Sequence, residues 1–171
     1  METEHGIKKL TLKNWREPDK ASAMYCGIYE DGIRTMDDND WAALFMDIEL
    51  SLTVPVEVIR LFETAKAALC YGWFYHSLYT LGMEQVSRVA ETAVKFKCIE
   101  MGLYVEKQTF YATIKKLADR GIIQPDEEEY WHNLRELRNS GSHPDIQMIL
   151  PPGVNITMVR GIARLISALF P

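Results

Sequence analysis

The chain has 171 residues, of which 47% are hydrophobic and 25% are charged, and its net charge is −5. This length and composition are typical of one well-packed soluble domain with an extension. The acidic balance argues against a protein that coats duplex DNA, because such proteins are usually basic.

Residues 1–50 are predicted to form an N-terminal extension of mixed structure. The pair Asp31-Gly32 separates two short apolar runs, which favours a β-hairpin. One aspartate of the run "DDND" at 37–40 is expected to cap a short helix that ends before Pro55. The remainder, residues 51–171, is predicted to be a separate helical domain.

The first long helix is predicted over residues 55–82, with apolar side chains around most of its circumference. Such a pattern is typical of a central helix that other elements touch on several sides. A second helix is predicted over 83–101, where the i,i+4 pairs Glu84–Arg88 and Glu91–Lys95 favour one solvated face.

Two further helices are expected after a short connection. Thr109 is predicted to cap a helix that Gly121 terminates. The next helix starts at Pro125 with acids at 126–129, which complement the helix dipole. Its buried stripe is predicted to comprise three residues, namely Tyr130, Leu134 and Leu137.

The last helix is predicted over residues 156–170, with Asn155 or Thr157 as its cap. Gly161 either weakens this helix slightly or allows a close approach to a neighbour. Short connections between amphipathic helices favour antiparallel neighbours. The fold class is therefore predicted to be all-α, an antiparallel up-and-down bundle of four to five main helices with a small mixed N-terminal extension.

Several polar or reactive residues are interpreted structurally. Cys26, Cys70 and Cys98 lack the spacing of a disulfide framework or zinc site. The i,i+4 pair Glu128–His132 is interpreted as a solvated helix face, because no third metal ligand accompanies it. We therefore expect no metal and no cofactor. Without a leader sequence or a run long enough to span a bilayer, we expect a cytoplasmic protein that makes no membrane contact.

Aromatic residues concentrate at 71–79 in the run "YGWFYHSLY". A broadly apolar helix is expected to place these rings in the core or in a subunit interface rather than on a base-stacking surface. His76, in the same run, is expected to be a hydrogen-bonded core histidine.

Candidate chemistry concentrates in "LRELRNSGSHPD", residues 134–145, where a helix is expected to end at Gly141. Histidine can exchange a proton with a ribose oxygen near neutral pH, as His143 would. Arginine can bind a phosphate through two N–H groups and stabilise its developing charge, as Arg138 would. Asn139 can donate to a phosphate oxygen or orient the histidine. A structural role for Arg138, capping the terminal carbonyls of its helix, stays open on spacing alone.

The signature Arg138-x4-His143, with the polar Asn139 after the arginine, resembles that of the HEPN superfamily. The resemblance extends to the order of four segments and covers roughly residues 56–170. These segments are "SRVAETAVKFKCIEMG", "TFYATIKKLADRGII", "LRELRNSGSHPD" and "ITMVRGIARLISAL".

The resemblance implies a helical bundle that dimerises and sets two arginine–histidine signatures in a shared cleft. Active members are metal-independent endoribonucleases. Many of them are effectors in bacterial defence against phage or toxins of toxin–antitoxin pairs. By this resemblance Arg138 and His143 are catalytic and Asn139 binds RNA phosphate or supports them. The partners would be a second copy of the chain, RNA, and an antitoxin or another protein. Glu91 is the nearest match to a charged residue that some members use on an earlier helix.

An alternative follows from the same resemblance. The superfamily also contains catalytically inactive members that serve as protein-interaction modules. Both functions remain open from the sequence.

Overall fold

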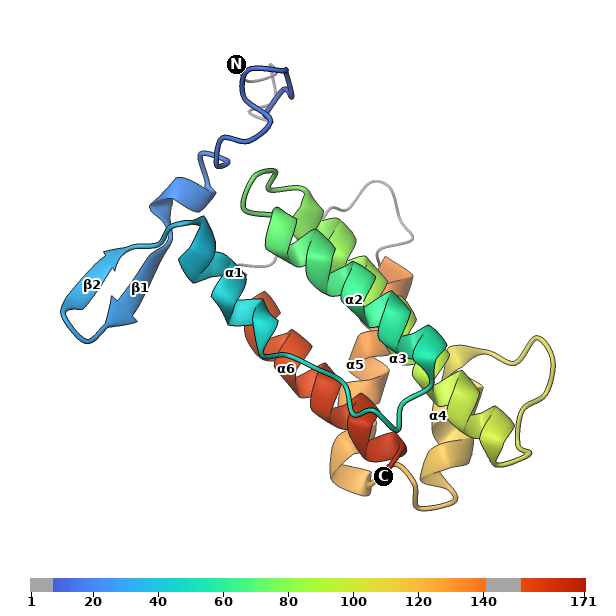
Figure 1. Ribbon diagram of the computed structural model, residues 1–171. Helices are drawn as coiled ribbons and strands as arrows, with labels where there is room; N and C mark the ends of the chain where they lie inside the picture. The colour runs from blue at the N-terminus through green and yellow to red at the C-terminus, as the bar shows by residue number, and fades with distance from the viewer. Residues whose placement is uncertain (1–7, 141–151) are drawn as a thin grey trace.

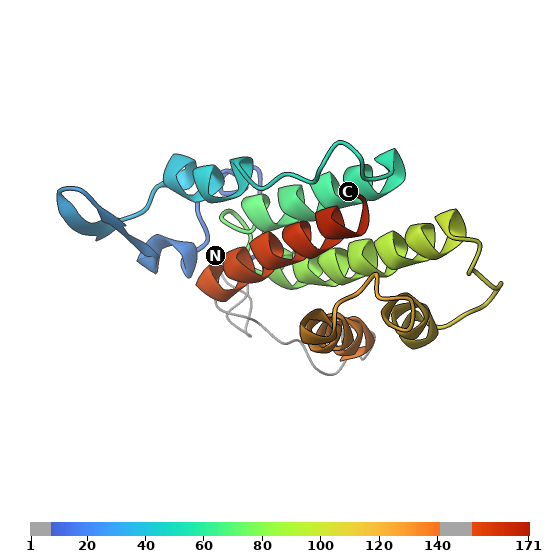
Figure 2. The same cartoon turned by 90° about the horizontal axis from the view of Figure 1, so that it is seen from below.

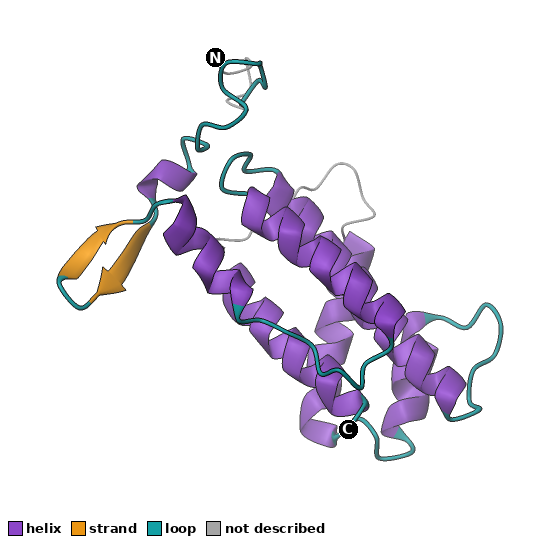
Figure 3. Cartoon of the chain, viewed as in Figure 1, coloured by secondary structure: helices purple, strands orange, loops and turns teal. Residues whose placement is uncertain are grey.

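The computed structural model describes residues 8–140 and 152–171, which are mostly helical (Figure 3). A 3₁₀ turn at Ser22–Met24 precedes β1 (Cys26–Tyr29), β2 (Gly32–Thr35), α1 (Asp38–Met46), α2 (Val56–Tyr71), α3 (Leu78–Glu100), α4 (Phe110–Ala118), α5 (Pro125–Ser140) and α6 (Pro152–Leu169). The prediction of an all-α bundle with a small mixed N-terminal extension is confirmed. None of the helices in these two ranges is long and apolar enough to cross a membrane.

The predicted hairpin forms, and it projects from the helical body beyond α1 (Figure 1). Its strands are antiparallel, with Ile28 opposite Ile33. Gly32 follows the turn with φ of 125°, a conformation that residues with a Cβ rarely adopt. The Asp31-Gly32 pair therefore marked the turn because the backbone there requires a glycine.

The predicted cap of the short helix α1 is Asp37. Its side chain accepts a hydrogen bond from the backbone N–H of Asp40, and the Asp40 side chain accepts one from the N–H of Asp37. Arg34 donates two hydrogen bonds to the Asp40 carboxylate, at 2.6 and 3.1 Å. These bonds, followed by the one from the Asp37 N–H, lower the pKa of Asp40 to about 2. The hairpin and α1 are thus joined through one carboxylate.

The prediction of a single helix over 55–82 is wrong, because the chain turns at 72–77 between α2 and α3. A Cβ on Gly72 would lie 2.2 Å from the Tyr79 ring, so only glycine fits at this turn.

Gly82, expected to end a helix, lies inside α3. A Cβ there would lie 2.6 Å from Cγ of Leu69. Gly82 therefore allows α2 and α3 to pack closely.

The central helix of the bundle is α3, since it packs against α2, α4, α5 and α6. Figure 1 shows α2, α3 and α6 with roughly aligned axes, α2 running opposite to the other two. Figure 2 shows α4 and α5 nearly end-on beneath α3. The pair α4–α5 therefore crosses α3 steeply. Side chains near the end of α5 and along one face of α3 meet at this crossing.

The boundaries of α4 follow the prediction. Thr109 accepts a hydrogen bond from the N–H of Ala112. Gly121 has φ of 68°, and the N–H of Ile122 returns to the carbonyl of Leu117. Local sequence alone accounts for both ends.

Two expectations for α5 and α6 are corrected. Tyr130 is 65% exposed, whereas its neighbour Trp131 is fully buried together with Leu134, because α5 turns its indole toward α3 and α4.

The last helix begins at Pro152, so Asn155 is a buried residue within α6 and not its cap. At Gly161 a Cβ would meet nothing within 4 Å, so this glycine mediates no close approach.

An aromatic cluster joins the N-terminal extension to the bundle. The Trp41 ring of α1 stacks on Trp73 at 6.1 Å, and Tyr25 and Tyr79 lie beside them. The Trp41 indole N–H also donates to the carbonyl of Cys70 at 3.2 Å. Trp73 and Tyr79 are buried, as expected for core residues, whereas Tyr71 is exposed. His76 is half-buried, with its ring edge-on to Tyr79.

Burial of this cluster predicts a loss of stability at alkaline pH. Burial raises the pKa of the Tyr79 phenol above its usual value, and it does the same for Tyr25. Below a pH of about 10 both the folded and the unfolded chain keep the proton, and above it the unfolded chain loses the proton first. The free energy of unfolding should therefore fall as pH rises above about 10. Urea titrations between pH 8 and 11 should show a shallower fall for Tyr79→Phe than for the wild type, and equal slopes would contradict the assignment.

Candidate functional site

Arg138 lies in the last turn of α5, beside the buried stripe that contains Leu134 and Leu137. Its Nε donates a hydrogen bond to Oε2 of Glu91 on α3 at 3.2 Å. The two side chains are 43% and 33% exposed, so the ion pair remains open to solvent. The structure therefore places the predicted arginine where a ligand can reach it.

Of the other two signature residues, the structure describes Asn139. Asn139 follows Arg138 in α5, and its Oδ1 accepts a long hydrogen bond of 3.5 Å from Nη1 of Arg138. This contact uses the amide oxygen of Asn139, whereas the predicted donation to a phosphate oxygen would use its amide nitrogen. His143 lies outside the described residues. The structure thus brings Arg138 and Glu91 together and leaves the position of His143 as a prediction.

The ion pair found for Glu91 differs from the expected helix-surface pair with Lys95. Within the described ranges, the ion pair of Glu91 joins it to Arg138, 47 positions along the chain. The Lys95 amine instead lies over the Tyr104 ring, 5.2 Å from its centroid. The crossing of α5 over α3 explains the difference, because it brings a guanidinium to the outer face of α3.

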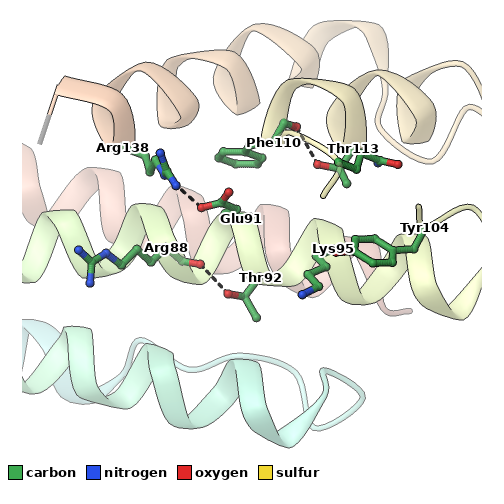
Figure 4. A pocket seen from close by; sticks show the side chains of 9 residues that line it. Arg88, Glu91, Thr92, Lys95, Tyr104, Phe110, Thr113 and Arg138 are labelled. Carbon is green, nitrogen blue, oxygen red and sulfur yellow. Dashed lines mark hydrogen bonds and ion pairs between the residues drawn. The ribbon is translucent and has the colours of Figure 1, made fainter. Parts of the chain in front are cut away.

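A cavity of about 490 Å³ opens beside this ion pair, where α3, α4, α5 and the 103–108 loop meet. Its lining consists of Arg88, Glu91, Thr92, Lys95, Tyr104, Gln108, Phe110, Thr113 and Arg138. Figure 4 shows Arg88 and Lys95 on opposite sides of Glu91 along α3, with Arg138 reaching in from α5. The lining thus holds three cations and one carboxylate, a local excess of positive charge in an acidic protein.

The polar groups of the cavity differ in what they can offer a ligand. The hydroxyls of Thr92 and Thr113 donate to carbonyls of their own helices, at 2.8 and 2.7 Å. Gln108 accepts from Lys116 at 2.6 Å through its carbonyl oxygen. Its amide nitrogen is buried and has no hydrogen-bond partner among residues 8–140 and 152–171. A ligand in the cavity would therefore meet cations, whereas the buried amide of Gln108 would have to turn outward to reach it.

The acids at 126–129 are distant from this site. They occupy the first turn of α5, and the rise of an α-helix places them roughly 14 to 18 Å from Arg138 along its axis. Glu128 pairs there with His132 at 3.5 Å, and the His132 ring stacks on Tyr111, so the face predicted to be solvated is partly covered. In the part of the chain that the structure describes, no group of three or more metal-ligating side chains comes together.

Sequence reasoning missed the contributions of Arg88, Lys95, Tyr104 and Gln108 to this site. One available signal was the spacing of Arg88, Glu91 and Lys95 at i, i+3 and i+7, which puts all three on one helix face. That spacing was assigned to surface pairing, because the neighbouring helix could not be known. The aromatic ring and the amide come from a loop without a motif.

Comparison with known proteins identifies a family that covers the centre of the bundle. A family described as "Domain of unknown function (DUF4145)" matches residues 71–158, which is just over half of the chain and includes α3, α4 and α5. No curated protein and no solved structure matches the chain. The matched range contains both partners of the Glu91–Arg138 ion pair and the whole lining of the cavity. The chain belongs to the DUF4145 family.

Proposed function

We propose that this protein is a HEPN-like, metal-independent endoribonuclease that acts as a homodimer. It works in the bacterial cytoplasm as a defence effector or as the toxin of a toxin–antitoxin pair, with an antitoxin or another protein as partner. Arg138 binds the phosphate at the cleaved bond, His143 transfers protons, and Asn139 supports them. Glu91 holds the Arg138 side chain in place.

The observation that carries this proposal is the Glu91–Arg138 ion pair at the mouth of the cavity. An arginine that only capped its own helix would direct its guanidinium at the terminal carbonyls of α5. Nε of Arg138 reaches across to Glu91 on α3, beside Arg88 and Lys95. A carboxylate that orients a guanidinium toward a positively charged cavity is a suitable arrangement for binding a phosphate.

The chemistry requires an acid, a base and a fixed cation. As the base, His143 of the partner subunit takes the proton of the ribose 2′-hydroxyl. The 2′-oxygen then bonds to phosphorus, while the bond from phosphorus to the 5′-oxygen breaks. His143 gives a proton to that leaving oxygen, and Arg138 stabilises the charge on the remaining phosphate oxygens. The products are a 2′,3′-cyclic phosphate and a 5′-hydroxyl.

A second function, a catalytically inactive interaction module, has its own supporting observation. The Glu91–Arg138 hydrogen bond links α3 to α5 and accounts for both residues without any substrate. Exposed ion pairs contribute up to about 1 kcal/mol to stability. In that case Arg138 serves packing and the protein acts by binding a partner.

Incubation of the purified protein with mixed RNAs decides between the two functions. Because arginine and histidine need no metal ion for this reaction, we expect cleavage in EDTA, with 2′,3′-cyclic phosphate ends. His143→Ala should remove that cleavage and keep the same helical circular dichroism. Sedimentation should give a species of twice 19.7 kDa for both proteins. Identical RNA patterns from the two proteins would leave the interaction module, and a monomer would exclude the shared cleft.

A further inference from the structure

We propose that Arg88 and Lys95 are phosphate-binding residues, and that they hold the RNA strand along α3 on both sides of the Glu91–Arg138 pair. The inference rests on the proposed function and extends it, because it assigns the groups that bind the neighbouring nucleotides. None of these contacts involves the proton transfer itself.

Two cations of the cavity are spaced along the axis of α3. Arg88 and Lys95 are seven residues apart in α3, which corresponds to about 10.5 Å along the helix axis. Glu91 lies between them along α3, and Arg138 reaches it from α5 (Figure 4). Cations spaced along α3, with a third that reaches in from α5, can contact successive phosphates of one extended strand that runs along α3.

The charged side chains of the cavity already make contacts within the protein. The Glu91 carboxylate, the one acid in the lining, is engaged by Arg138 at 3.2 Å. Lys95 makes an approach of 5.2 Å to the face of the Tyr104 ring. A cation–π contact leaves the ammonium hydrogens on the far side available to a phosphate oxygen.

The aromatic ring of Tyr104 lies beside Lys95. Tyr104 is half-buried in the cavity wall, and Gln108 offers a buried amide N–H that has no partner among the described residues. Proteins that bind single strands combine cations for the backbone with rings on which bases stack. A base that stacks on Tyr104 would occupy the cavity that Gln108 also lines. The cavity volume of about 490 Å³ lies within the range of small-ligand sites and fits one nucleotide.

The test measures RNA binding in a protein that cannot cleave. In the His143→Ala background, a fluorescein-labelled single-stranded oligoribonucleotide of mixed sequence is titrated at several salt concentrations, with anisotropy as the readout. Arg88→Ala and Lys95→Ala should each weaken binding about fivefold to tenfold for every sequence. Each should also reduce the slope of log K against log salt by about 0.7.

The matched control is Arg60→Ala, which removes the same charge from the exposed face of α2, outside the cavity. It should leave both the affinity and the salt slope unchanged. Tyr104→Ala should weaken binding roughly tenfold, while Tyr104→Phe, which keeps a ring, should bind like the parent. Normal affinity in Arg88→Ala and Lys95→Ala, or an equal loss in Arg60→Ala, would overturn the inference.

The outcome is separable from that of the proposed function. RNA binding that depends on Arg88 and Lys95 without cleavage by the wild type would support this site and exclude the nuclease. Cleavage that depends on His143, with binding unaffected by Arg88→Ala and Lys95→Ala, would support the nuclease and exclude this site.

Discussion

Arg138→Ala should reduce the rate of RNA cleavage by at least about 100-fold, the scale of removing a donor that stabilises a developing oxyanion. Arg138→Lys should retain only part of the activity, because lysine keeps the charge but cannot bind phosphate through two parallel N–H groups. Single-turnover rates on a labelled RNA measure both effects. Circular dichroism of each variant shows whether the helical fold is retained.

Glu91→Gln separates orientation of the guanidinium from binding of the substrate. The substitution removes the one negative charge of the cavity lining, so RNA should bind more tightly and KM should fall. It also weakens the hydrogen bond that holds Nε of Arg138, so kcat should fall roughly tenfold. A simple structural role for Glu91 would change neither constant at temperatures where the protein is folded.

Mixed dimers test whether the two signatures act together. If the arginine and histidine of both subunits share one cleft, a dimer of one wild-type and one Arg138→Ala subunit should lose more than half of its activity. A loss of half would show that the subunits act independently.

Should Arg138→Ala lower only the free energy of unfolding, by about 1 kcal/mol, the interaction module would be the better description of the protein.

Gly82→Ala should destabilise the bundle by about 1–3 kcal/mol, the usual cost of overpacking a tight core. The new Cβ would lie 2.6 and 2.7 Å from Cγ and Cδ2 of Leu69, which is fully buried, and 3.1 Å from its backbone nitrogen. Leu69 cannot move away without separating α2 from α3. Urea denaturation followed by circular dichroism at 222 nm measures the change.

The matched control is Gly161→Ala, the same substitution inside α6. A Cβ at Gly161 meets nothing within 4 Å, so the change should stabilise the protein by about 0.5–1 kcal/mol through the higher helix propensity of alanine. The two variants should therefore move in opposite directions. A stabilising Gly82→Ala would mean that α2 and α3 do not pack as closely as described.

The sequence by itself determined the features that depend on neighbouring residues. Asp37 and Thr109 cap helices with their own side chains, and Gly32 and Gly121 adopt backbone conformations that favour glycine. These interactions span three or four positions, so a short segment contains all the atoms that matter. The all-α class followed in the same way, from apolar spacing within each helix.

The tertiary structure decided which face of each helix is buried and which charges meet. Trp131 rather than Tyr130 enters the core because α5 contacts α3 and α4 at a particular rotation, and neighbouring apolar residues in the sequence fit the pattern almost equally. The break at Gly72 depends on the Tyr79 ring, seven residues away.

The candidate site shows the same division. The sequence indicated Arg138 and Asn139 through their position at a helix end, and it indicated His143 beyond it. It assigned Glu91 and Lys95 to each other, because an i,i+4 pair is the nearest opposite charge along a helix. Only the crossing of α5 over α3 made Arg138 the partner of Glu91 and left Arg88 and Lys95 lining a cavity. Electrostatic pairing depends on distance in space, and the packing of α3 against α5 brings together Glu91 and Arg138, which are 47 positions apart in the chain.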